Sequence, residues 1–314
     1  MLYIKSLNEA EDVFKSLSAP MRLKIMEMIY EDKEWSMNDL AEALDLTNSA
    51  ISMHVSKLEQ AGLVTIQTKA GKRGNLKIVK PNHSRMMIDL APIKETRTFY
   101  QDDIRVGHYS NYQITPTCGI ATPTKIIGTF DDPRFFNFSE RFDAGILWFG
   151  SGFIEYNLPN HLKAGQTLDE LQISFELSSE YPGFNNDYPS DIYFSINGIS
   201  LGLYVSPGDY GERKGFVTPN WWPDTLNQYG LLKTLIINKE GTFIDGSDKI
   251  SDTTITELEI NYISSISFRF EVPKDAANCG GFTLFGENFG DYNQAIRVKA
   301  FYTDHICEKT AKEQ

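Results

Sequence analysis

Residues 36–79 read SMNDLAEALDLTNSAISMHVSKLEQAGLVTIQTKAGKRGNLKIV, and this stretch decides the fold of the N-terminal part of the chain. Its apolar residues first recur at helical intervals and then alternate at strand intervals on either side of a glycine-rich, basic turn. The pattern predicts two short helices followed by a β-hairpin. The rest of the 314-residue chain carries no pattern of similar specificity.

The two predicted helices have recognisable starts. Ser36 and Asp39 form the S-x-x-D pattern of a capping box before the first helix. Thr47 or Asn48 can cap the second helix. We expect its inward face to consist of Ile51, Val55 and Leu58. The opposite face is small, polar and free of acids, which suits close approach to base edges and phosphates, and it consists of Asn48, Ser49, Ser52, Met53, Ser56 and Lys57.

A basic hairpin follows Gly62, which we expect to end the second helix in a left-handed conformation. Between Lys57 and Arg85 the chain has seven basic residues and one acid, Glu59. A run of charge is often only a solvated surface, but at a hairpin tip directly after two such helices it favours contact with DNA phosphates. The hairpin candidates are Lys69, Lys72, Arg73 and Lys77. Together these parts predict a winged helix-turn-helix, which places one helix in the major groove.

The distribution of charge supports a division of the chain. The formal net charge is -12, yet residues 1–81 hold eleven basic and eleven acidic residues. The remainder holds nineteen basic and thirty-one acidic residues and therefore carries the whole excess. We expect DNA to meet the neutral N-terminal part, with the acidic part held away from the phosphates.

The N-terminal motifs resemble ArsR-type winged-helix transcriptional regulators over about residues 8 to 80. In SAPMRLKIMEMIY, residues 18–30, the positions that match are Ser18, Pro20, Arg22, Leu23 and Ile25. In the recognition helix they are Ser49, Ser52, His54, Leu58, Ala61, Gly62, Leu63 and Val64, and Val55 replaces the usual Leu. The resemblance implies binding to an inverted-repeat operator in double-stranded DNA by a homodimer, to which the first helix contributes, with the positions of Ser49, Ser52, Met53 and Ser56 facing the groove.

The chain departs from the metal-sensing members that this family contains. The segment before and within the first predicted helix, residues 34–40, has no Cys. The cysteines are isolated at positions 118, 279 and 307, and no Cys or His pair has the short spacing of a zinc or arsenite site. We therefore predict no metal and no cofactor.

The C-terminal two thirds predict an antiparallel β-sandwich of the jelly-roll type. Alternating or β-branched runs occur at residues 145–156, 171–177, 191–196, 201–205, 232–237, 265–272 and 295–302. Turn pairs such as Asn197-Gly198 and Asp245-Gly246 separate some of them. The predicted organisation is a winged helix-turn-helix at 1–81, a linker at 82–98 that can include a short helix at 84–90, a sandwich at 99–305 and a tail at 306–314. The fold class is a multidomain α+β and all-β chain.

Aromatic and amide side chains in two loops are candidates for binding a small ligand, and carbohydrate is the class that such residues favour. The candidates are Trp221, Trp222, Tyr229, Tyr188, Asn186 and Asp187. Core packing explains Trp221 and Trp222 equally well, and for Trp148 we favour a core role. A jelly roll that binds sugar is an analogy at the level of the fold.

Two groups of acidic residues could bind calcium or act in catalysis. The turn at residues 245–252 has the oxygen density of a calcium loop but lacks the spacing of an EF-hand, so an ordinary acidic turn is preferred. A pair among Asp187, Asp191, Asp209, Glu212 and Glu287 could serve a glycan-active enzyme. Since no sequence pattern brings any two together, we predict a non-enzymatic protein.

The N-terminal segment is amphipathic and acidic, so we expect no signal peptide, no membrane segment and a cytoplasmic location. The sequence thus predicts a cytoplasmic, homodimeric transcriptional regulator whose sandwich binds a small effector. The alternative is a sandwich that serves protein interaction or dimerisation without a small ligand.

Overall fold

The computed structural model describes residues 2–4, 6–31, 33–71, 74–83, 86–88 and 97–304. The chain separates into two compact units, residues 1–95 and 96–314, which are described separately here. The predicted tail at 306–314 lies outside the described residues.

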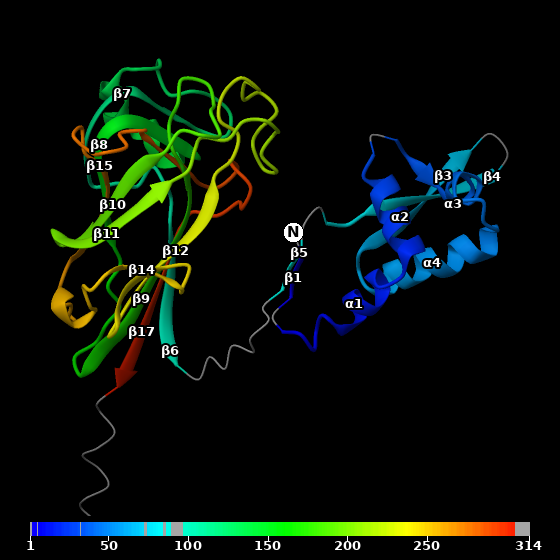
Figure 1. Ribbon diagram of the computed structural model, residues 1–314, viewed down its shortest axis with the longest axis horizontal. Helices are drawn as coiled ribbons and strands as arrows, with labels where there is room; N and C mark the ends of the chain where they lie inside the picture. The colour runs from blue at the N-terminus through cyan, green and yellow to red at the C-terminus, as the bar shows by residue number, and fades with distance from the viewer. Residues whose placement is uncertain are drawn as a thin grey trace, which may run out of the picture. The chain divides into compact units, whose positions relative to one another are not determined.

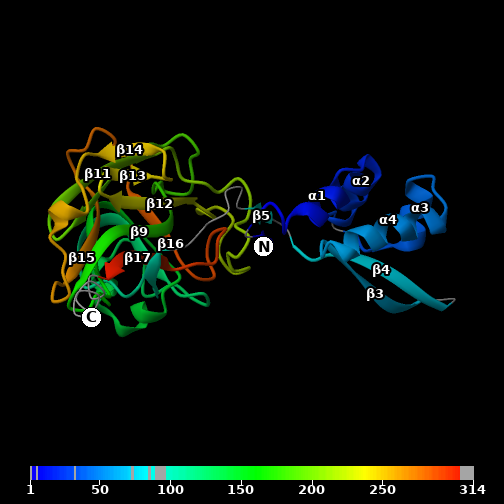
Figure 2. The same cartoon turned by 90° about the horizontal axis from the view of Figure 1, so that it is seen from below.

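Unit 1 contains four helices and a three-stranded sheet in its described part (Figure 1). The helices are α1 (Glu11–Leu17), α2 (Pro20–Ile29), α3 (Met37–Ala43) and α4 (Asn48–Gln60). The sheet has the order β2 (Trp35–Ser36), β4 (Gly74–Pro81) and β3 (Val64–Gly71). The long β3–β4 hairpin runs beside α4 (Figure 2). The predicted helix-turn-helix and wing are confirmed.

Local capping interactions fix the ends of the helix-turn-helix. The backbone N–H of Asp39 donates to the Ser36 hydroxyl at 3.2 Å, and the Ser36 N–H donates to the Asp39 carboxylate at 3.0 Å. Thr47, rather than Asn48, caps α4 through the N–H of Ala50. Gly62 follows α4 with φ +70°, in the left-handed region that favours glycine.

The core of unit 1 forms under α4. Ile51, Val55 and Leu58 are completely buried, as predicted from their spacing. They pack with residues of α2 and α3 that include Ile25 and Leu40. This packing fixes which face of α4 points to solvent.

The predicted helix at 84–90 is wrong for its described part. Met86–Ile88 forms strand β5, which pairs in parallel with β1 (Leu2–Ile4). Ile4 belongs to the buried core of unit 1, and Ile88 packs against that core. Tertiary pairing therefore overrides the weak local helical pattern.

Unit 2 is a 12-stranded antiparallel β-structure over its described residues. Its strands are β6 (Thr98–Ile104), β7 (Asn111–Ala121), β8 (Ile146–Leu158), β9 (Gln166–Ser178), β10 (Ser190–Ile196), β11 (Ile199–Ser206), β12 (Leu231–Asn238), β13 (Gly241–Ile244), β14 (Asp248–Ser251), β15 (Ile266–Val272), β16 (Phe282–Phe285) and β17 (Ile296–Asp304). Three short 3-10 helices lie at Pro133–Asn137, Ser139–Asp143 and Thr256–Leu258.

The strands form two layers. One layer has the order β11–β10–β15–β8–β7, and the other has the order β14–β13–β12–β9–β17–β6. Strand β16 pairs with both β8 and β9, so it joins the layers and nearly closes them into a barrel. Figures 1 and 2 show the β12–β13–β14 edge in yellow. The predicted sandwich is confirmed, and the seven predicted runs coincide with β8, β9, β10, β11, β12, β15 and β17.

A cluster of phenylalanines fills the space between the layers. Phe175 of β9 contacts the rings of Phe194, Phe268 and Phe270, which come from β10 and β15, at centroid distances of 5.6, 6.3 and 4.9 Å. All four side chains are essentially buried. Burial of these aromatic rings, together with the aliphatic side chains around them, holds the two layers together.

Replacing Phe175 with Ala should destabilise unit 2 by roughly 3–5 kcal/mol, because the change leaves a cavity between the layers. Phe138→Ala removes a ring that is 49% exposed and should cost about 1 kcal/mol or less. Chemical denaturation followed by tryptophan fluorescence checks both values. Equal losses in the two variants would contradict the assignment of Phe175 to the centre of the core.

Candidate functional site

The predicted DNA-facing side chains lie on the solvent side of α4. Asn48, Ser49, Ser52, Met53 and Lys57 are exposed, and Ser56 is half-buried. Met53 is 59% exposed, which is unusual for a large apolar side chain on a helix that buries its other face completely. An exposed, acid-free helix face of this kind can approach base edges closely.

The predicted basic residues of the wing differ in whether an acidic side chain pairs with them. Lys69 and Lys77 are exposed on β3 and β4. Glu34 pairs with Lys69 at 2.6 Å and with Lys80 at 3.4 Å, a partnership that the local sequence does not reveal. Such exposed pairs contribute little stability, but they reduce the positive potential of the wing. Lys72 and Arg73 lie outside the described residues.

Unit 2 contains a pocket of about 390 Å³ at one end of the sandwich. Residues from β7 and β8 meet there with loop residues that follow β7, follow β9 and precede β12. Its lining consists of Thr117, Phe130, Asp131, Trp148, Glu180, Tyr181, Pro182, Gly183, Trp222, Thr225, Leu226 and Asn227. A small-molecule site typically measures roughly 300–1,000 Å³ and combines aromatic walls with a few polar groups, as this pocket does.

Aromatic side chains form a continuous series along the pocket. The Trp148 ring lies 5.7 Å from that of Phe130 and 5.8 Å from that of Trp222. Trp148 and Trp222 are almost wholly buried, whereas Phe130 and Tyr181 remain 46% and 37% exposed. Gly119 makes the position of Trp148 possible, because a Cβ atom there would lie 2.1 Å from the indole.

Two buried acids belong to this end of the sandwich. Glu180 is 8% exposed, and its carboxyl accepts a hydrogen bond from the Thr283 hydroxyl at 3.1 Å. Asp209 is fully buried and accepts from the Tyr181 N–H at 3.1 Å and from the Ser178 hydroxyl at 3.0 Å. Burial raises the pKa of Asp209 to about 7. Burial, reinforced by the charge of Asp209, raises the pKa of Glu180 well above its usual value.

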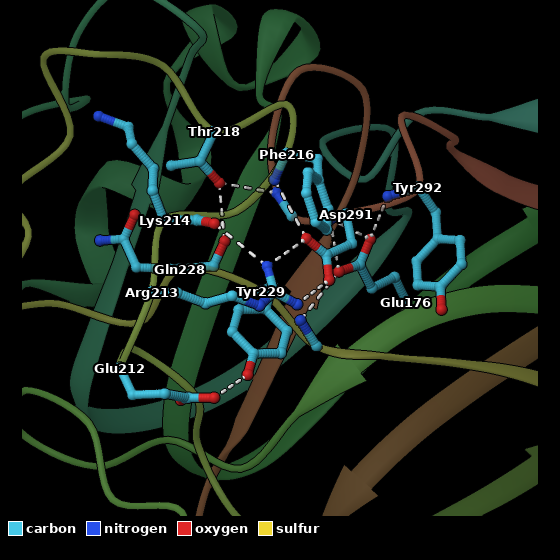
Figure 3. Close-up of polar contacts among 12 residues, drawn as sticks. Glu176, Glu212, Arg213, Lys214, Phe216, Thr218, Gln228, Tyr229, Asp291 and Tyr292 are labelled. Carbon is cyan, nitrogen blue, oxygen red and sulfur yellow. Dashed lines mark hydrogen bonds and ion pairs between the residues drawn. The ribbon is translucent and has the colours of Figure 1, made fainter. Parts of the chain in front are cut away.

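A polar network joins the loop that precedes β12 and the loop that precedes β17 to Glu176 of β9 (Figure 3). Glu176 accepts backbone hydrogen bonds from Gly230 at 2.8 Å, Asp291 at 2.9 Å and Tyr292 at 3.0 Å. Burial raises the pKa of Glu176 to about 8, although these N–H groups oppose the shift. Arg213 binds the Asp291 carboxylate with two nitrogens, at 2.7 and 3.1 Å. The network fixes the loop that carries Trp222 relative to β9.

One of the six predicted ligand residues lines the pocket, and the other five lie outside its lining. Trp222 lines the pocket, and its indole N–H donates to the Asn227 carbonyl at 2.8 Å. Trp221 lies outside the lining and donates to the Pro123 carbonyl at 2.6 Å. Tyr188 contacts the ring of Tyr181, which does line the pocket.

The other three predicted residues also lie outside the pocket lining. The Tyr229 hydroxyl donates to Glu212, and Arg213 lies over the Tyr229 ring at 3.7 Å (Figure 3). The Asn186 side chain also hydrogen-bonds to Glu212. The Asp187 N–H donates to the Asn185 side chain at 3.0 Å, which is a local turn interaction.

Sequence reasoning missed Phe130, Asp131, Glu180 and Asn227, and it assigned Trp148 to the core. Trp148 is buried and lines the pocket at once. Glu180 directly precedes the loop at 181–191 from which candidates were drawn, so extending that loop by one residue would have included it. Phe130 and Asp131 carry no local signal, because only the fold brings them to Trp148.

In the acidic segment at residues 245–252, residues 245–247 form the turn of the β13–β14 hairpin, with positive φ at Asp245 and Gly246, and Asp248–Ser251 forms β14. Asp245 pairs with Lys233 at 2.8 Å, and Asp252 pairs with Lys249 at 2.7 Å. Within the described parts of the chain, no group of three or more His, Cys, Asp or Glu side chains is arranged to hold a metal ion. No helix in those parts is long and apolar enough to cross a membrane.

Comparison with known proteins identifies the class of unit 1. The family described as "Bacterial regulatory protein, arsR family" matches residues 19–65. The structure of reduced HlyU from Vibrio cholerae N16961 is 27% identical over a match that covers 24% of this chain and 76% of that chain, with a TM-score of 0.22. No curated protein matches the chain. The chain therefore carries an ArsR-family DNA-binding domain, joined to an antiparallel β-sandwich.

Asp209 should make unit 2 less stable as pH rises. Between the pKa of an unfolded Asp, 3.8, and about 7, the folded protein holds a proton that the unfolded chain has lost. The free energy of unfolding therefore falls as pH increases through this range, by about 4 kcal/mol at most. Asp209→Asn should reduce this fall, since an amide does not take up or release this proton, and its oxygen can still accept from the Tyr181 N–H.

Urea denaturation at about pH 5 and about pH 8 measures this decrease in the free energy of unfolding. Asp224→Asn is the matched control, because the Asp224 side chain is 89% exposed. An unchanged pH dependence in the Asp209 variant would show that this carboxyl titrates normally in the folded protein.

Proposed function

We propose that this protein is a homodimeric transcriptional regulator, controlled by a small effector that binds in the pocket of unit 2. Carbohydrate is the effector class that we favour. The observation that carries the proposal is an aromatic pocket with buried polar groups in the same chain as an ArsR-family DNA-binding domain. Such a regulator acts where DNA is present, which accords with a cytoplasmic location.

The exposed face of α4 supports the assignment of DNA contacts. Its small side chains and Met53 can reach base edges in the major groove, and the wing can lie along the backbone. Two copies of α4 in a homodimer would read the two halves of an inverted repeat. We propose Asn48, Ser49, Ser52, Met53 and Ser56 for sequence reading.

The lysines have a different proposed role, which is to contact phosphate. Lys57 and Lys77 are exposed, and the described residues give neither an acidic ion-pair partner. Lys69 shares Glu34 with Lys80 and is a weaker candidate. Lys72 and Arg73 remain candidates from the sequence.

The composition of the pocket supports a sugar. Aromatic rings pack against the apolar C–H face of a pyranose, and short polar side chains bind its hydroxyls. Phe130 and Tyr181 offer exposed rings, while Asn227 and Thr117 offer polar groups beside them. We propose that unit 2 binds its ligand without converting it, since Glu180 and Asp209 both accept hydrogen bonds from the protein itself.

Replacing Lys57 and Lys77 together with Gln should weaken binding to every DNA duplex by a similar factor. If each lysine contacts one phosphate, the slope of log K against log salt should decrease by about 2. Fluorescence anisotropy with a random-sequence duplex over a range of salt measures this. Replacing Lys163 and Lys274 together with Gln, at two exposed sites in unit 2, is the control of equal charge. An unchanged slope would contradict the phosphate contacts.

A screen of neutral and charged sugars by thermal shift tests the effector. A sugar that binds should raise the melting temperature of unit 2 and change the affinity of the protein for its operator. Phe130→Ala should abolish the shift, whereas Phe138→Ala, an exposed ring outside the pocket lining, should preserve it. If no sugar stabilises the wild-type protein, the proposed effector class is wrong.

A further inference from the structure

The pocket of unit 2 is acidic and contains no base. None of its twelve lining residues is Lys, Arg or His, whereas Asp131 and Glu180 are both carboxylic acids. A site for a neutral sugar would commonly mix donors and acceptors, and a site for an acidic ligand would need cations. Because the lining has two acids and no Lys, Arg or His, it favours a ligand with a positive charge.

Glu180 lies among polar groups that satisfy part of its carboxyl, and burial disfavours the ionised form of that carboxyl. Its partner Thr283 also accepts a hydrogen bond from the Asn227 amide at 3.0 Å. Among the described residues, no Lys, Arg or His forms an ion pair with Glu180, Asp209 or Asp131. Burying a carboxylate without a counter-ion is costly. A cation that enters beside Glu180 supplies the missing counter-ion and so favours the ionised form of this carboxyl.

Asp131 supplies the second charge from a different element. It is exposed, and its carboxylate accepts a hydrogen bond from the Cys118 N–H at 2.9 Å. That contact orients the side chain where β7 meets the loop that carries Phe130. The charges of Asp131 and Asp209 both disfavour ionisation of Glu180, and a bound cation would offset both of them.

The aromatic series provides the other half of a cation site. The negative face of an aromatic ring attracts an ammonium group within about 6 Å of its centroid, and Trp gives the strongest attraction. Phe130, Trp148 and Trp222 follow one another at centroid distances below 6 Å, with tilted or edge-on planes. Trp148 lines the pocket together with Asp131 and Glu180, so one cation can meet both the indole and the carboxyl groups.

We infer that the pocket selects a ligand that carries a positive charge beside an apolar ring face, and that the ligand is an amino sugar with a protonated amine. Asp131 and Glu180 bind the ammonium group beside Trp148, while Phe130 and Tyr181 contact the sugar ring. This inference rests on the proposed function and narrows it from carbohydrates in general to cationic ones.

Isothermal titration of the full-length protein with D-glucosamine, D-glucose and N-acetyl-D-glucosamine, at about pH 6.5, tests the charge requirement, since the free amine is then protonated. Glucosamine should bind at least about tenfold more tightly than either neutral sugar. Tetramethylammonium, which has the charge but no sugar ring, is included as a fourth probe.

Two variants test the residues. Asp131→Asn keeps the acceptor for Cys118 and tolerates the positive φ at this position. It should reduce glucosamine affinity about tenfold or more and leave the affinity for neutral sugars unchanged. Glu180→Gln should behave in the same way, and Asp224→Asn should bind like the wild type.

The outcomes separate this inference from the proposed function. Equal or tighter binding of glucose would overturn the charge requirement and leave the carbohydrate effector intact. Binding of tetramethylammonium alone would support the cation site and overturn the sugar. If no probe binds, both the amino-sugar inference and the sugar effector fail, while DNA binding is judged separately by the salt slope.

Discussion

Buried carboxylates that accept backbone hydrogen bonds are the constraint on which the candidate pocket depends. The loops at this end of the sandwich have little regular secondary structure, so their N–H groups need other acceptors. Glu176 binds three of these groups, Asp209 binds that of Tyr181, and Asp191 binds that of Asn278 at 3.1 Å. Each acid loses hydration on burial and regains hydrogen bonds, which fixes one loop relative to one strand. The aromatic walls keep their positions because these loops are held in place.

The same carboxylates explain where sequence reasoning succeeded and where it stopped. Asp191 and Asp209 look like candidates for catalysis when only their residue type and neighbours are known. In the structure they organise loops, and the acids that enter the pocket lining are Asp131 and Glu180. The role of an acid depends on which N–H groups surround it. The N–H group that Asp209 binds lies 28 residues away in the chain, and the one that Asp191 binds lies 87 residues away. No local pattern contains that information.

Helix and strand assignments could be predicted because their signals are local. The Ser36–Asp39 capping box and Gly62 mark ends of helices through contacts within three or four residues. In β8, β9 and β15 apolar residues recur at alternate positions, because one face of each strand is buried. The pairing of β1 with β5 had no such signal, since it depends on an edge 84 residues earlier in the chain. The bridging role of β16 is equally non-local, because it pairs with two strands of different layers.

A ligand in unit 2 can regulate DNA binding only if its affinity differs between a DNA-competent and an incompetent state of the protein. Closing a pocket whose residues come from several loops is one way to create such a difference. The Trp222 loop connects through Gly230 and Glu176 to β9, which pairs with β17, and β17 pairs with β6, the first strand of unit 2. A shift in the pairing of β6 with β17 would alter where the chain enters the sandwich. Spatial continuity alone does not establish coupling, so the decisive quantity is the ligand affinity measured with and without operator DNA, which must change by the same factor as the DNA affinity.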